Sequence, residues 1–101
     1  MLLNPFKRYK LSKELDKNYE EMKNLTEKMD QLNTVIELLL AQCEKLNPLT
    51  VEFVDCLNKS KALGKEYEKI LNQHTILLNR NDEILHTLYN IWGSTDPYFS
   101  S

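Results

Sequence analysis

An alternation of four- and three-residue steps constrains this chain more than any other feature of its sequence. The seam begins at residue 11 and continues without a slip to residue 46. Its members are Leu11, Leu15, Asn18, Met22, Leu25, Met29, Leu32, Ile36, Leu39, Cys43 and Leu46. Such heptad spacing places the a and d side chains on one side of a helix and is typical of coiled coils. We therefore predict a helix over residues 11–46.

A second seam with the same alternation follows from residue 53. Its members are Phe53, Cys56, Ser60, Leu63, Tyr67, Ile70, His74, Leu77, Asn81, Ile84, Leu88 and Ile91. It is more polar than the first seam, but the steps are equally regular. The spacing predicts a second helix over residues 51–92, with Gly93 as its stop signal and residues 93–101 as a tail.

Two Asn-Pro pairs mark the helix starts. Asn47 and Pro48 read as a cap and a first helical residue within a turn over residues 47–50, because proline lacks the amide that a first turn cannot use. Asn4 and Pro5 read in the same way, so residues 1–10 are either a basic arm or the start of the first helix.

The register of the two seams tests whether the helices form a hairpin. Antiparallel helices bring an a residue of one to a d residue of the other, and if Leu46 faces Phe53 the numbers of each facing pair add up to 99. Asn18 then faces Asn81, and the matched amides can share hydrogen bonds and penalise slipped registers. The sequence thus predicts an all-α antiparallel hairpin, a coiled coil that completes a multi-helix bundle with partner chains.

The same register makes Cys43 and Cys56 a facing layer beside the turn. We expect small apolar core residues there, because two cysteines without a secretory signal indicate a reducing, cytoplasmic location. A disulfide is geometrically conceivable at a facing layer. A zinc site would need more ligands than the two distant histidines supply.

The e positions of the second helix form a further apolar stripe, which a two-helix seam does not bury. Its members are Leu57, Leu71, Leu78, Leu85 and Trp92, interrupted once by Gly64. We expect a partner helix to cover the stripe, and the alternative is that a terminal segment of this chain folds back over it. Gly64 either lets a partner backbone approach closely or marks a bend.

Charge and composition narrow the functional classes. The net charge is −2, so we expect no nucleic acid bound through the body of the protein. The basic residues near the start could meet an anionic surface or simply end the helix in solvent: Lys7, Arg8, Lys10 and Lys13. No apolar run is long enough for a membrane span. Glu83 and His86 have the spacing of di-iron bundles but occur once, so we expect no enzyme, no cofactor and no small-molecule substrate.

Residues 60–88 resemble the C-terminal helix of dynactin's small shoulder subunit. The similarity lies in Ser60, Lys61, Ala62, Leu63, Glu66, Tyr67, Lys69, Asp82, Glu83 and Leu85. It implies a long helical subunit packed among partner helices in a dynein-activating complex. The function expected is thus that of a non-catalytic coiled-coil subunit or scaffold of a multiprotein complex. The resemblance implies a cytoskeletal motor or trafficking complex as its setting. The alternatives are a homodimeric four-helix bundle and a small nucleic-acid-binding regulator that uses the basic arm.

Overall fold

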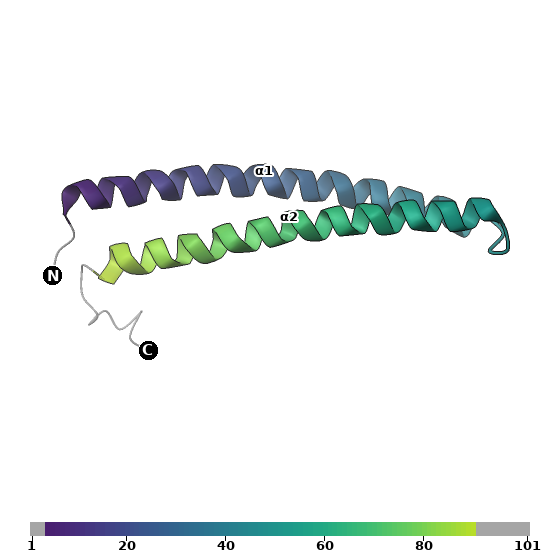
Figure 1. The fold of residues 1–101 in the computed structure, drawn as a ribbon. Coiled ribbons are helices and arrows are strands. Elements are labelled where there is room, and N and C mark those ends of the chain that lie inside the picture. The colour runs from purple at the N-terminus through teal and green to yellow at the C-terminus, as the bar shows by residue number, and fades with distance from the viewer. Residues whose placement is uncertain (1–3, 91–101) are drawn as a thin grey trace. The chain divides into compact units, whose positions relative to one another are not determined.

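The computed structural model describes residues 4–90 and contains two helices there. Helix α1 spans Pro5–Glu44 and helix α2 spans Val51–Asn90, joined by a short turn (Figure 1). The two helices pack as an antiparallel hairpin, which confirms the predicted all-α hairpin. The predicted end of the second helix at Trp92, the stop at Gly93 and the tail over 93–101 lie outside the described residues.

Helix α1 begins with the cap that its sequence predicts. The side-chain oxygen of Asn4 accepts a hydrogen bond of 2.8 Å from the amide of Phe6, and the carbonyl of Asn4 accepts one of 3.0 Å from the amide of Arg8. Pro5 is the first helical residue, where its missing amide costs nothing. Residues 5–10 are therefore the start of α1 and not a separate arm.

The turn differs from its prediction in which residue caps α2. Asn47 does not cap the helix: its side-chain oxygen binds the amide of Leu49, and Pro48 lies in the turn instead of the helix. The hydroxyl of Thr50 accepts a hydrogen bond of 3.3 Å from the amide of Phe53, three residues on. Thr50 is thus the N-cap, because its side chain satisfies an amide that the first turn leaves unpaired.

The chain divides into two compact units, each of which pairs a stretch of α1 with a stretch of α2. We call residues 24–74 the turn unit, and the described residues 4–23 and 75–90 the terminal unit. Within residues 4–90, every predicted seam residue is buried or half-buried. Both seams are therefore the core, as the heptad pattern predicts.

The matched asparagine layer forms the polar centre of the terminal unit. The side-chain amide of Asn18 donates a hydrogen bond of 2.9 Å to the side-chain oxygen of Asn81, and the two residues are 7% and 2% exposed. The amide of Asn81 in turn lies 3.2 Å from the sulfur of Met22. The predicted Asn18–Asn81 pair is confirmed, and with it the register of this unit.

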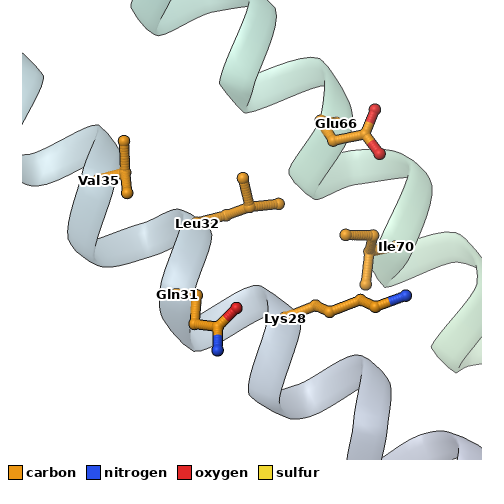
Figure 2. Close-up of a pocket in the computed structure, with 6 residues that line it drawn as sticks. All are labelled: Lys28, Gln31, Leu32, Val35, Glu66 and Ile70. Carbon is orange, nitrogen blue, oxygen red and sulfur yellow. The ribbon is translucent and has the colours of Figure 1, made fainter.

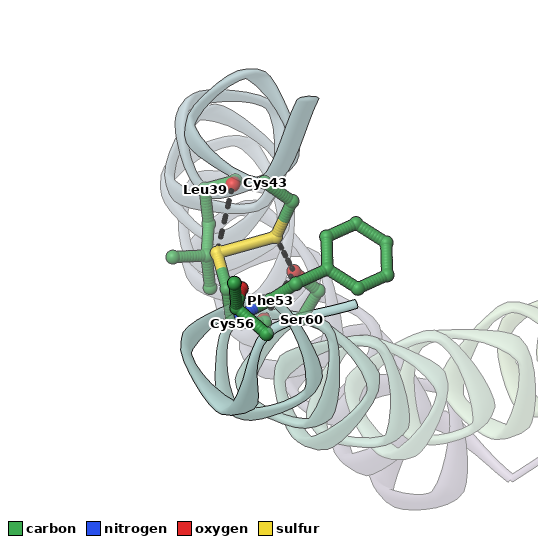
Figure 3. Close-up of a disulfide and its surroundings, with 6 residues drawn as sticks. Leu39, Cys43, Phe53, Cys56 and Ser60 are labelled. Carbon is green, nitrogen blue, oxygen red and sulfur yellow. Dashed lines mark hydrogen bonds between the residues drawn. A yellow bond between two sulfur atoms is a disulfide. The ribbon is translucent and has the colours of Figure 1, made fainter. Parts of the chain in front are cut away.

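A disulfide between Cys43 and Cys56 fixes the register of the turn unit (Figure 3). The two Cα atoms are 5.7 Å apart, within the range that a disulfide spans. The facing layer was predicted correctly, but the expectation of two separate thiols was wrong. That expectation rested on a reducing compartment inferred from composition, whereas the bond depends on the distance that this register creates.

Ser60 packs one turn along from the disulfide. Its hydroxyl donates a hydrogen bond of 3.1 Å to the carbonyl of Cys56 and lies 4.0 Å from the sulfur of Cys43. The sulfur of Cys56 lies 3.4 Å from the carbonyl oxygen of Leu39. After reduction, each thiol would therefore have an oxygen acceptor beside it, so the layer remains compatible with the hairpin.

Reduction of the disulfide should weaken the hairpin without unfolding it. Closing a loop of about 15 residues contributes about 3 kcal/mol in the chain-entropy model. We expect Cys43→Ser/Cys56→Ser to lower the free energy of unfolding by about 2–3 kcal/mol, measured by urea denaturation followed by circular dichroism. Reductant should destabilise the wild type and leave the variant unchanged. An equal response of both proteins to reductant would contradict the structural role of the bond.

Removing one partner of the asparagine layer should cost more than removing both. Asn81→Leu removes the acceptor that the buried amide of Asn18 has on α2, which we expect to cost about 1–3 kcal/mol. Asn18→Leu/Asn81→Leu leaves no buried amide and should recover most of that loss. A double-mutant cycle from urea denaturation measures the coupling, and additive losses would argue against the bond.

Candidate partner-binding surface

The register places the e positions of both helices on one side of each unit. In the turn unit, this side is formed by Thr26, Asn33 and Leu40 of α1 and by Leu57, Gly64 and Leu71 of α2. None of these residues is charged. We call this set the uncharged face of the turn unit. An apolar partner could pack on it without burying an unpaired charge of this set.

The terminal unit has an e side of the same character. Its members are Ser12 and Tyr19 of α1 and Leu78 and Leu85 of α2, again without a charge. Leu78 is 51% exposed and Leu85 is half-buried.

The predicted stripe is partly covered by the hairpin itself. In the turn unit, Leu71 is 43% exposed whereas Leu57 is half-buried. Trp92 lies outside the described residues. Partner binding by these side chains stays a prediction.

Gly64 lies within α2, which continues through it. A Cβ atom added at this position would meet nothing within 4 Å. The glycine is therefore not required by packing inside the chain. Its missing side chain leaves open space in the uncharged face, which we call the notch, and another backbone or a large side chain could come close there.

The opposite side of each unit is formed by the g positions and is charged. In the turn unit, an open groove of about 460 Å³ lies here, lined by side chains of both helices (Figure 2). Its lining residues are Lys28, Gln31, Leu32, Val35, Glu66 and Ile70. Among the described residues, each unit therefore has an uncharged e side and a charged g side.

In the terminal unit, the g side carries a two-pronged ion pair. Arg80 donates from Nε to Glu14 at 2.6 Å and from Nη2 to the other carboxylate oxygen at 2.9 Å, and its Nη1 lies 3.3 Å from Glu83. The hydrogen bond from Arg80 holds the pKa of Glu14 below its ordinary value. The pKa of Arg80 is raised, chiefly by its hydrogen bond to Glu14.

The four basic residues near the start lie on the first turns of α1. The amino group of Lys10 lies 4.8 Å from the centre of the Phe6 ring, and that of Lys13 lies 5.5 Å from the Tyr9 ring. Arg8 is half-buried, while Lys7 is exposed. The structure thus places them around a helix end and does not gather them into one patch.

Within residues 4–90, no group of three or more His, Cys, Asp and Glu side chains could hold a metal ion. Glu83, the carboxylate of the Glu-x-x-His step, contacts Arg80. Neither helix in this described part has an apolar stretch that could cross a membrane.

Sequence reasoning missed two features of these surfaces. The stripe was identified on α2 alone, although the same register puts Leu40 and Asn33 of α1 on the same side. The Glu14–Arg80 pair was also missed. Both could have been found by extending the facing rule from the a and d positions to the e and g positions.

The comparisons with known proteins add no relative. No protein-family model matches the chain, and neither a curated protein nor a solved structure does. The resemblance of residues 60–88 to dynactin's shoulder subunit therefore stays a prediction.

Acid should weaken the terminal unit through Glu14. A carboxylate whose pKa is lowered in the folded state contributes stability above its unfolded pKa, and this stability is lost as pH falls through the folded pKa. We expect Arg80→Gln to return the pKa of Glu14 towards its ordinary value of 4.5, measured by carboxyl-carbon NMR. Glu83→Gln, which removes only the longer contact, should leave it low. An unchanged pKa in Arg80→Gln would contradict this assignment.

Proposed function

We propose that this chain is a non-catalytic helical hairpin that binds other helices and serves as a subunit or scaffold of a protein complex. The observation that carries the proposal is the chemical difference between its two sides. The g side offers charges that favour solvent, whereas the uncharged face offers leucines, small polar groups and a glycine notch. Packing of a further helix is the use to which such a face is best suited.

The energies limit the affinity of one contact through the uncharged face. Fully burying an exposed leucine side chain contributes about 1.5–3 kcal/mol, and association itself costs about 4–15 kcal/mol. The few leucines of this face are already partly covered and contribute less than this each, so one such contact gives a weak affinity. A scaffold subunit held by several such contacts does not need more.

A cytoskeletal motor or trafficking complex is the setting that the resemblance of residues 60–88 suggests. The homodimeric four-helix bundle is the second candidate, since two hairpins could cover each other's uncharged faces. The nucleic-acid alternative has less support, because the basic residues are distributed around the start of α1.

The disulfide bears on where the protein works. Disulfides persist in oxidising compartments and are rare in the cytosol. The cytoplasmic location predicted from composition stays a prediction, and the Cys43–Cys56 bond counts against it.

Charges placed on the uncharged face should abolish partner binding. We expect Leu57→Asp/Leu71→Asp to lose the proteins that the immobilised wild type recovers, together with any self-association seen by light scattering. Leu38→Asp is the matched control, because Leu38 is 62% exposed on the other side of the turn unit. Circular dichroism verifies that each variant is helical. Identical behaviour of all three proteins would contradict the proposed function.

A further inference from the structure

The outer edge of the uncharged face is acidic along α1. Going around a helix, the b positions follow the e positions on the side away from the seam. In the turn unit, the b positions of α1 are Asp30, Glu37 and Glu44, and all three are exposed. Their spacing of seven residues lines them up along one edge.

These three carboxylates have no basic residue one helical turn away along α1. No Lys or Arg stands three or four residues before or after any of them, although such pairs stabilise exposed helices. Within residues 4–90, the ion pairs join Arg80 to Glu14 and Glu83 and involve none of the three. Glu37 accepts a hydrogen bond of 3.4 Å from Asn33, which leaves its charge in place. The edge is thus a row of negative charge beside an apolar surface.

The edge along α2 has a different composition. The b positions there are Val54, Lys61 and Glu68, which carry no net charge together. A helix lying on the uncharged face would therefore meet negative charge on one flank and a balanced edge on the other. Charge complementarity requires basic residues on the flank over α1.

One way of stacking a second copy does not meet this requirement. A twofold axis across the helices that stacks two turn units on their uncharged faces, with Gly64 facing Gly64, also brings Asn33 to Asn33. Asp30 of one copy would then face Glu37 of the other, twice by symmetry. Like charges brought together oppose this pairing, so the edge acts against this form of self-association.

We propose that the uncharged face of the turn unit binds a helix of another protein that carries an apolar stripe with Lys or Arg along one flank. The basic flank lies over Asp30, Glu37 and Glu44, and a large apolar side chain of the partner enters the notch at Gly64. This inference rests on the proposed function and adds the chemistry and orientation of the partner.

The test uses two designed peptides with the same leucine heptads. One carries lysine along one flank and the other carries glutamate at the same positions. We expect the full-length chain to bind the lysine peptide about tenfold more tightly than the glutamate peptide, because three weak exposed charge contacts are favourable with lysine and unfavourable with glutamate. Fluorescence anisotropy at low and high salt measures both affinities, and salt should narrow the difference.

Reversing the edge should reverse the preference. Asp30→Lys/Glu37→Lys/Glu44→Lys should favour the glutamate peptide. The matched control is Glu52→Lys/Asp55→Lys/Glu66→Lys, which makes the same change of net charge on the other side of the turn unit and should keep the preference for lysine. Circular dichroism verifies the fold of both. Equal preferences in the two triple variants would mean that net charge, and not the edge, selects the peptide, and this would overturn the inference.

Gly64→Ala distinguishes a role of the notch in peptide binding from an effect on the stability of the hairpin. Alanine is favoured over glycine within a helix, and its methyl group has open space here, so the isolated chain should become more stable. Binding of the lysine peptide should nevertheless weaken several-fold. Unchanged or tighter binding would contradict the notch.

The outcomes distinguish this inference from the proposed function. If Leu57→Asp/Leu71→Asp abolishes binding of both peptides but the edge reversal has no effect, the basic flank is wrong and the helix-binding function stands. If the wild type instead forms a dimer that Leu57→Asp/Leu71→Asp dissociates, the partner is a second copy and the inference is overturned. If the leucine variant binds both peptides like the wild type, the function and the inference both fail.

Discussion

The facing rule between the two helices is the constraint on which the rest of this structure depends. The number of one residue determines the number of its partner, and each unit contains one specific pair that obeys the rule, the amides of Asn18 and Asn81 in one and the disulfide of Cys43 and Cys56 in the other. Because the side chains of a coiled coil repeat every seven residues, the next alternative register shifts one helix by seven residues. Such a shift would separate Asn18 from Asn81, and the disulfide opposes it. The same rule determines which residues form the uncharged face and which form the charged one.

Much of this could be predicted from the sequence, because heptad spacing and the matched asparagines carry geometric information directly. The two helices, a short turn between them and the facing layers followed from counting residues, although α1 ends at Glu44, two residues before the predicted end. The bond between Cys43 and Cys56 did not, because composition suggested a reducing compartment while the distance that decides pairing appears only in the folded chain. The cap at Thr50 was missed because Asn47 and Pro48 have an equally good cap signal, and only the hydrogen bonds show which one the helix uses.

The charged g side and the uncharged e side of each unit have different roles in our proposal. Polar groups that need partners find them inside the chain, as Arg80 does with Glu14, and these contacts hold the helices together. The surface proposed for other molecules is the one that carries no charge and where Gly64 leaves space. A carboxylate row beside that surface adds direction, since it distinguishes one flank of an incoming helix from the other.

The position of the disulfide beside the turn also has a mechanical consequence. If the two ends of the hairpin were pulled apart, the helix pair would open like a zipper from its termini, and the opening would stop at Cys43 and Cys56. The residues between the cysteines would bear no load, because the tension would pass through the sulfur atoms. When the force was released, the two helices would pair again from the end that the disulfide holds, in the same register as before. The disulfide thus preserves the register of the two helices while the hairpin is under tension.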